Sequence, residues 1–72
     1  MLNEKDFFTT FGNKVKQFRK QKGWSQLNMA LELGIHPNEL SNIECGRRNP
    51  TLKTVFKIAA ALGVEFKELF EF

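Results

Sequence analysis

The sequence predicts an all-α domain of five helices, and three features of the chain indicate it. Apolar residues recur at spacings of three and four, which places them on one face of a helix. Glycines and residues suited to helix caps separate these segments. No stretch alternates between apolar and polar residues as a half-buried strand does. With 72 residues, eight of them Phe, the chain is long enough to form one small domain spanning residues 1–72.

The composition argues against several classes of protein. The single cysteine, Cys45, cannot form an internal disulfide, which favours a reducing, cytoplasmic setting. We expect it to be a partly buried thiol near a helix end. No run approaches the roughly 20 apolar residues of a membrane span, and no secretory signal is recognisable. One histidine, no paired cysteines and no nucleophile–base set indicate neither an enzyme nor a metal site, and no cofactor or small-molecule ligand is expected.

The net charge of +3 is unevenly distributed. The first basic group contains no acidic residue and comprises Lys14, Lys16, Arg19, Lys20 and Lys22. A second basic group comprises Arg47, Arg48 and Lys53, whereas the end of the chain is acidic. This asymmetry suits a protein that turns one face toward an anionic polymer and another face toward a partner. Charge runs on short helices are also common as solvated faces, so charge alone leaves both interpretations open.

The first helix is predicted over residues 11–22. Its apolar stripe consists of Phe11, Val15 and Phe18. Gly23 ends it, and we expect Trp24 to fill the core below that end rather than to stack on a base. Residues 1–5 are expected to form a frayed end, whereas residues 6–10 either extend this helix or form a turn.

Three N-terminal phenylalanines, Phe7, Phe8 and Phe11, are too apolar to remain exposed in a stable monomer. We expect them to pack on the C-terminal segment, either within the chain or across a dimer. The sequence does not separate these two alternatives.

Two short helices joined by a tight turn are predicted between about residues 26 and 45. Ser25 is a suitable N-cap for the first helix, over residues 26–33. Gly34 provides the left-handed residue that ends it, and His36 and Pro37 begin the second helix. The predicted buried positions are Met29, Ala30, Leu33, Leu40 and Ile43. Their spacing, with a small residue where the helices cross, is that of a DNA-binding helix-turn-helix.

Leu27 and Leu31 lie away from this buried face. We expect them to be partly buried against a neighbouring helix, and the alternative is that they form a contact patch for a partner.

Beyond the motif, Gly46 closes the second short helix and residues 47–50 form a basic loop. Thr51 caps a further helix over residues 52–62, and Gly63 ends it. The apolar face of that helix is predicted to be Leu52, Val55, Phe56, Ile58, Ala59 and Leu62. The last helix is predicted over residues 65–70, with Phe66, Leu69 and Phe70 apolar.

Over about residues 13–69, the chain resembles the phage repressor/Cro family of helix-turn-helix proteins, also called XRE-type. The residues that carry the resemblance are Ser25-Gln26, Leu40-Ser41-x-Ile43-Glu44-x-Gly46 and Asn49-Pro50. The resemblance implies a repressor-like domain that binds double-stranded DNA in the major groove. It also implies a stand-alone regulator of transcription, a repressor or controller, acting as a homodimer on a palindromic operator.

Because Leu40 and Ile43 point inward, the opposite side of the second short helix is left to face DNA, and its residues match the family's base-reading positions. They are His36, Pro37, Asn38, Ser41 and Asn42. Pro37 is equally explained by starting the helix. Contacts with the DNA backbone are predicted for Gln26, Arg47, Arg48 and Asn49. Glu39 is ambiguous: it either accepts from cytosine, caps its own helix or discriminates against wrong sites.

Related proteins carry a salt bridge at the positions of Arg19 and Glu44, and the resemblance therefore assigns this pair to structure. A dimerisation segment is predicted over about residues 63–72. Its interface residues are expected to be Val64, Phe66, Leu69, Phe70 and Phe72.

Two other functions compete with the operator-reading regulator. One is an antitoxin or adaptor that uses the same fold to hold a protein partner through Leu27, Leu31 and the phenylalanine-rich ends. The other is an architectural DNA binder whose contacts are almost all with phosphates.

Overall fold

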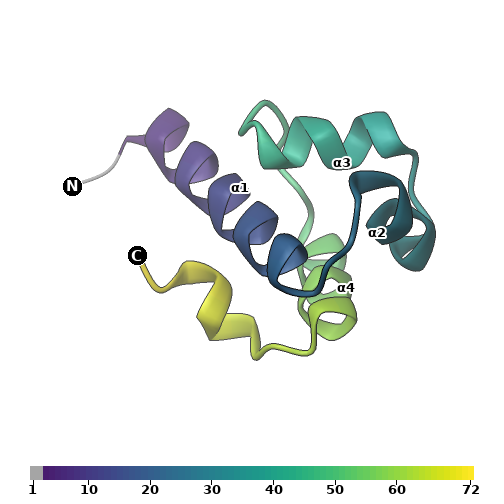
Figure 1. Ribbon diagram of the computed structural model, residues 1–72. Coiled ribbons are helices and arrows are strands. Elements are labelled where there is room, and N and C mark those ends of the chain that lie inside the picture. Colours follow the sequence, from purple (N-terminus) through teal and green to yellow (C-terminus); the bar gives the residue numbers. More distant parts are fainter. Residues whose placement is uncertain (1–2) are drawn as a thin grey trace.

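The computed structural model describes residues 3–72 and consists of four α-helices followed by a 3-10 helix (Figure 1). The elements are α1 (Glu4–Gln21), α2 (Gln26–Leu33), α3 (Pro37–Glu44), α4 (Leu52–Leu62) and η1 (Phe66–Phe70). The all-helical prediction and the order of the elements are confirmed. The prediction of five α-helices is wrong at the last element, where the five residues of η1 form the tighter 3-10 turn.

Side chains near the helix ends fix the predicted boundaries. The N-caps predicted at Ser25, His36 and Thr51 are all present. Ser25 and Asn28 form a reciprocal capping box, in which each side chain accepts from the other residue's backbone N–H. Gly34 ends α2 with a φ of 70°, a conformation that costs glycine no side-chain clash.

Helix α1 begins at Glu4 rather than near Phe11, so residues 6–10 extend it, which is one of the two alternatives considered for them. Asn3 caps it by accepting from the backbone N–H of Asp6 at 2.8 Å, so the expected frayed end is wrong for residues 3–5. Met1 and Leu2, the rest of that expected end, lie outside the described residues.

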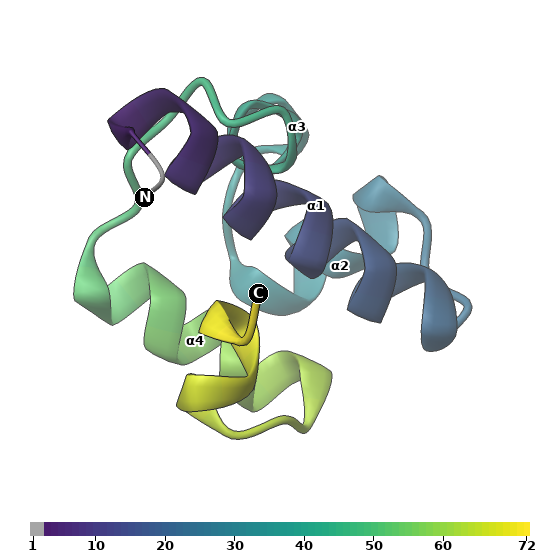
Figure 2. The same cartoon turned by 90° about the vertical axis from the view of Figure 1, so that its left-hand side faces the viewer.

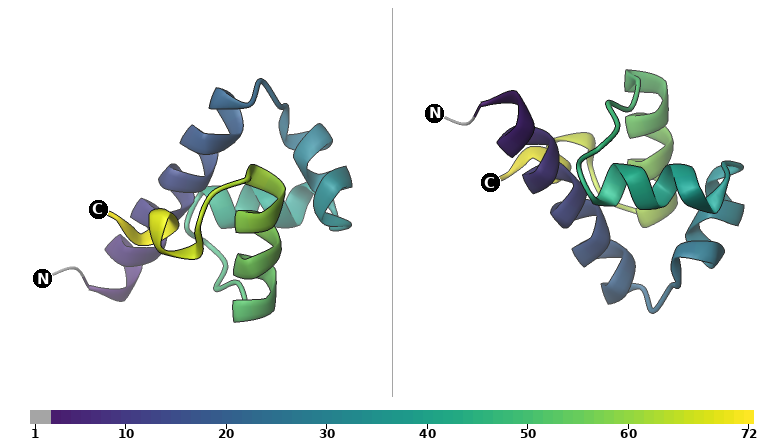
Figure 3. Two further views of the ribbon diagram at one scale, coloured as in Figure 1. Left: turned by 90° about the horizontal axis from the view of Figure 1, so that it is seen from below. Right: turned by 90° about the horizontal axis from the view of Figure 1, so that it is seen from above.

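The extra turns of α1 are stabilised by aromatic contacts with the end of the chain. The ring of Phe70 stacks on Phe11 at a centroid distance of 5.2 Å and on Phe7 at 6.0 Å. Phe72 lies 5.7 Å from Phe7. The C-terminal segment accordingly runs beside the first half of α1 (Figure 3). Of the two alternatives for the N-terminal phenylalanines, the structure shows packing within the chain.

The helices surround one core. Helix α1 packs on α3 and η1, while α2 contacts both α3 and α4 (Figure 2). The fully enclosed side chains are those of Phe11, Val15, Met29, Leu40, Ile43, Ile58 and Leu69. No helix within residues 3–72 combines the length and the apolar character that a membrane span requires.

Four predicted core or partly buried leucines and phenylalanines are instead on the surface. Leu27 is 55% and Leu31 70% exposed, so their expected burial against a neighbouring helix is wrong. Leu52 is 76% and Phe56 65% exposed, because α4 turns only the stripe containing Val55, Ile58, Ala59 and Leu62 toward the core. The apolar face of α4 therefore extends beyond the part that the domain covers.

Gly12 allows α1 to approach α3 closely. It is buried in the middle of α1, and a Cβ atom added there would lie 2.5 Å from the carbonyl oxygen of Glu44 and would also overlap that of Ile43. Both neighbours are backbone atoms, which cannot rotate away as the tip of a side chain can.

Gly12→Ala is expected to lower the free energy of unfolding by about 1–3 kcal/mol through overpacking at this crossing. This outcome opposes helix propensity, which favours Ala over Gly by about 0.5–1 kcal/mol. Urea denaturation followed by circular dichroism measures the change. The exposed neighbour provides the control, because Asn13→Ala should be neutral or stabilising. Equal or greater stability of Gly12→Ala would contradict the close approach.

Candidate nucleic-acid interface

Helix α3 lies across the surface of the domain, with one side in the core and the other outside (Figure 3, right). Leu40 and Ile43 are buried as predicted. The five residues predicted to read bases all lie at the start or on the outer side of α3. His36 and Asn38 are exposed, and Pro37, Ser41 and Asn42 are half-buried. The structure therefore gathers them on one polar strip, which we call the α3 outer face.

At the start of α3, His36 and Pro37 both have roles in forming the helix. His36 Nδ1 accepts a hydrogen bond of 3.1 Å from the backbone N–H of Asn38, which leaves Nε2 for an outside contact. Pro37 occupies the first turn, where its missing N–H leaves no bond unmade. The structural role considered for Pro37 is thus observed.

The C-terminal end of α3 is held by a buried ion pair. Arg19 Nε lies 2.7 Å from Glu44 Oε2 and Nη2 lies 3.1 Å from Oε1, as predicted for this pair. The two side chains are only 8% and 2% exposed. Arg19 Nη1 also donates to the backbone oxygen of Trp24 at 2.7 Å. Arginine and carboxylate thereby satisfy each other in the low dielectric of the interior.

Gln26, at the start of α2, joins the same network. Its Nε2 atom donates to Glu44 Oε1 at 3.0 Å. The ion pair and this bond together connect α1, α2 and α3 at one point. Gln26 therefore braces the end of α3, and the second hydrogen of its amide remains available for the predicted contact with a phosphate.

The loop after α3 folds back onto the helix, an arrangement that the sequence did not predict. Arg47 Nε donates to Asn42 Oδ1 at 3.3 Å. Arg48 Nη1 lies 4.0 Å from Glu39 Oε1, at the limit of an ion pair, and the two side chains are 52% and 34% exposed. This contact is a role for Glu39 outside the three alternatives considered. Asn49 is exposed beside these arginines.

Some of the lysines in the first basic group pack against aromatic side chains of the domain. Lys22 Nζ lies 4.5 Å from the Trp24 ring centroid and donates to the backbone oxygen of Ala61 at 3.3 Å. Lys14 Nζ lies 5.6 Å from the Phe18 ring. Trp24 is half-buried against the core, in agreement with its predicted structural role. These lysines therefore belong to the scaffold rather than to the α3 outer face.

Cys45 is exposed, so the expectation of a partly buried thiol is wrong. It is the C-cap residue of α3, at the point where the chain leaves the core for the loop. Across the part of the chain that the structure describes, no three His, Cys, Asp or Glu side chains gather as metal ligands would.

The predicted dimer interface is only partly available at the surface. Leu69 is fully buried and cannot contact a partner, which corrects its assignment. Phe70 stacks on Phe11 and helps to line a hollow of about 250 Å³ beside Leu52. The large apolar side chains exposed in this region are Leu52, Phe56, Phe66 and Phe72. We call these four residues the α4 apolar surface.

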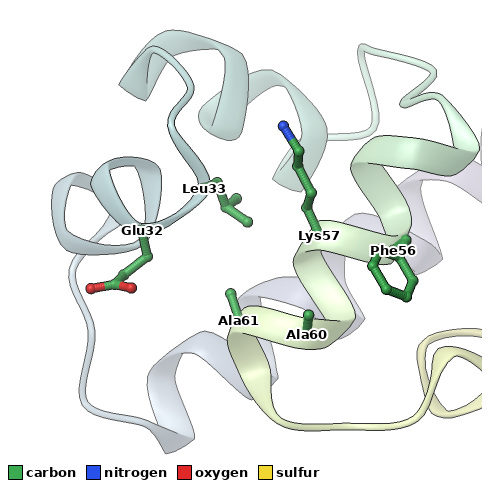
Figure 4. Close-up of a pocket in the computed structure, with 6 residues that line it drawn as sticks. All are labelled: Glu32, Leu33, Phe56, Lys57, Ala60 and Ala61. Atoms are coloured by element: carbon green, nitrogen blue, oxygen red, sulfur yellow. The ribbon is translucent and has the colours of Figure 1, made fainter.

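A second hollow of about 400 Å³ lies between α2 and α4 (Figure 4). Leu33, Phe56, Ala60 and Ala61 supply its apolar lining, and Glu32 and Lys57 complete it. Figure 4 shows the charged ends of Glu32 and Lys57 pointing away from the apolar floor. Phe56 belongs both to the lining of this groove and to the α4 apolar surface.

Removing Glu44 should be far more costly than removing Glu39. Glu44→Ala leaves the buried Arg19 charge unpaired and is expected to reduce the free energy of unfolding by about 3–5 kcal/mol. Glu39→Ala loses only an exposed pair, which is worth at most about 1 kcal/mol. Thermal and urea denaturation of both variants measure the difference. Similar losses for the two variants would contradict the structural role assigned to the buried pair.

Comparison with known proteins places this arrangement among helix-turn-helix proteins. Residues 15–69 match the family HTH_3, described as helix-turn-helix. The control protein C.BamHI of Bacillus amyloliquefaciens is 44% identical over 63 residues, which cover 86% of this chain and 78% of the relative. The control protein C.MunI of a Mycoplasma species is 41% identical over 66 residues, covering 90% and 89%.

A solved structure shows the same architecture. The crystal structure of the restriction-modification controller protein C.AhdI from Aeromonas hydrophila superimposes with a TM-score of 0.85. The two sequences are 35% identical, and the match covers 88% of this chain and 96% of the controller. The likeness therefore extends to nearly the whole of both domains.

Proposed function

Because the chain belongs to the HTH_3 helix-turn-helix family, we propose that it is a sequence-specific DNA-binding regulator of transcription that acts as a homodimer on a palindromic operator. The observation that carries this proposal is the α3 outer face, a polar strip on a helix whose other side is locked into the core. The controller proteins among its relatives support a controller or repressor role.

Reading of bases falls to the outward-facing polar residues of α3. An α-helix fits the major groove, where each base pair presents its own pattern of donors and acceptors. Asn38, Ser41 and Asn42 are one helical turn or less apart on the same side and carry short hydrogen-bonding side chains. Their reach is suited to base edges once α3 lies in the groove.

Residues around α3 are suited to position the protein on the duplex through contacts with the DNA backbone. Arg48 and Asn49 extend from the loop, and Gln26 stands at the start of α2, where free backbone N–H groups attract phosphate. Such contacts provide affinity and orientation but little sequence information. Base readers and phosphate contacts should therefore respond differently to mutation.

Selection from random duplex DNA with the purified protein is expected to enrich a palindrome. On that operator, Asn38→Ala should reduce discrimination at one base pair by about 1–3 kcal/mol. Arg48→Ala should weaken all sequences alike and lower the salt slope by about one. Anisotropy titrations at several salt concentrations measure both effects. A protein that enriches no sequence, or an Asn38→Ala variant with unchanged preference, would count against operator reading.

Dimerisation through the α4 apolar surface is the second part of the proposal. Leu52 and Phe56 lie one turn apart on α4, and contiguous exposed apolar side chains of this size favour a protein contact. In a two-fold dimer the same patch meets itself, so one surface suffices for both subunits.

Phe56→Glu is expected to convert the dimer into a monomer, because it places a charge in the centre of this contact. Leu31→Glu provides a matched control, since Leu31 is equally exposed but lies on α2. Sedimentation velocity at micromolar concentration with operator DNA distinguishes the two. Monomeric wild-type protein, or a Phe56→Glu variant that remains dimeric, would reject this surface.

An interaction module is the competing function, and one observation favours it. Leu27 and Leu31 are exposed on consecutive turns of α2, where a protein partner could cover them. Under that function, binding to DNA would be weak, steeply dependent on salt and without an enriched sequence.

A further inference from the structure

Arg47 is fixed beside Asn42 by the way α3 ends. The backbone N–H of Arg47 donates to the carbonyl of Asn42 at 2.9 Å, and that of Gly46 donates to Ile43 at 3.1 Å. These two bonds form a Schellman motif, in which Gly46 is the left-handed residue with a φ of 76°. The side chain of Arg47 then reaches Asn42 Oδ1 through Nε at 3.3 Å.

Helix α1 restricts this turn from the other side. A Cβ atom at Gly46 would lie 2.7 Å from the Cα atom and 2.8 Å from the backbone nitrogen of Thr9. The turn is therefore enclosed between α3 and the extended N-terminal part of α1. The backbone of Arg47 is held before any DNA is bound.

The contact determines which side of the Asn42 amide can face DNA. Arginine carries only donors, so the atom that faces Nε must be the amide oxygen. The bond directs one of the two lone pairs of Oδ1 at Arg47, and the NH₂, which can only donate, is the group of Asn42 that does not face the arginine. The paired contact of asparagine with adenine N6 and N7 uses both the oxygen and the NH₂, so it would have to share Oδ1 between Arg47 and the base, whereas a contact through the NH₂ alone leaves the Arg47 bond intact.

From this geometry we infer that Arg47 is a positioning residue for Asn42, which then donates to an acceptor edge of a base. Guanine, with N7 and O6, and thymine, with O4, present such edges in the major groove. Arg47 thus sets the base preference of Asn42 rather than serving as a simple phosphate contact. The inference rests on the proposed DNA-binding function and specifies one contact of it.

Arg48 differs from Arg47 in this respect. Its guanidinium is 4.0 Å from Glu39, which is not among the five residues predicted to read bases, and its side chain is 52% exposed. The two neighbouring arginines therefore have separable roles, and Arg48 is the natural control for Arg47.

Two substitutions separate the donor of Arg47 from its charge. Arg47→Lys keeps the positive charge but places a methylene group where Nε stood. Arg47→Gln loses the charge but keeps an N–H donor the same number of bonds from the backbone. Affinities of both variants, of Arg48→Lys and of Asn42→Ala are measured by anisotropy on the selected operator. The base pair assigned to Asn42 is the one at which Asn42→Ala loses discrimination. All variants are also titrated on operator duplexes in which that base pair is replaced by each of the others.

Arg47→Lys is expected to reduce discrimination at that base pair by about fivefold to tenfold, with the salt slope unchanged. Arg47→Gln should retain most of the discrimination, and its salt slope should be smaller than that of the wild type because one positive charge is lost. Arg48→Lys should alter neither quantity. In the Asn42→Ala background, Arg47→Lys should have no further effect on discrimination, because the group that it positions is gone.

The inference is overturned if Arg47→Lys discriminates as the wild type does, which is the behaviour of a phosphate contact. It is also overturned if Asn42→Ala discriminates at every base pair as the wild type does. A third contrary result is that the assigned base is adenine and that removal of its N6 amino group weakens binding as much as Asn42→Ala does. These results are distinct from failure of the proposed function, in which the wild-type protein itself shows no preference for any sequence.

Discussion

The buried pair of Arg19 and Glu44 is the interaction on which the orientation of α3 depends. An eight-residue helix is too short to be stable alone, so its position comes from its contacts. The pair joins α1 to the end of α3, and Gln26 adds the start of α2 to the same carboxylate. Two buried charges contribute little net stability compared with apolar residues. Their directional bonds do, however, join the three helices at one carboxylate, and the α3 outer face is presented in the arrangement that they hold.

Glycine at the contact of α1 with α3 complements this pair. Gly12 brings the backbone of α1 against the last turn of α3, and Gly46 allows the following turn to pass beside Thr9. The second contact depends on α1 being longer than its apolar stripe alone requires, because Thr9 lies in the turns that precede Phe11. The aromatic packing of Phe7 and Phe11 on Phe70 holds those extra turns in place. The C-terminal segment therefore supports the recognition helix indirectly, through α1, although it lies on another side of the domain.

The features predicted correctly from sequence are those that depend on neighbours along the chain. Caps such as Ser25 and His36 and the ending at Gly34 follow from local chemistry. The family resemblance added the pair of Arg19 and Glu44, which no spacing indicates. Errors arose where distant segments decide the outcome. The exposure of Phe56 and the burial of Leu69 depend on which side of each element the core occupies. The contact of Arg47 with Asn42 depends on the loop turning back, which composition does not reveal.

The two surfaces required of a dimeric operator reader lie on different elements and are separated by the core. The α3 outer face is polar, while the α4 apolar surface lies on α4 and the C-terminal segment. A partner subunit on the second surface leaves the first free for DNA. The longest dimension of the domain is 33 Å, and the other two are 23 and 21 Å. Half-sites one turn of B-DNA apart require about 34 Å. Under the proposed dimerisation, two copies meet this requirement when their recognition helices are set apart along the long dimension of the domain, and not along either of the shorter ones.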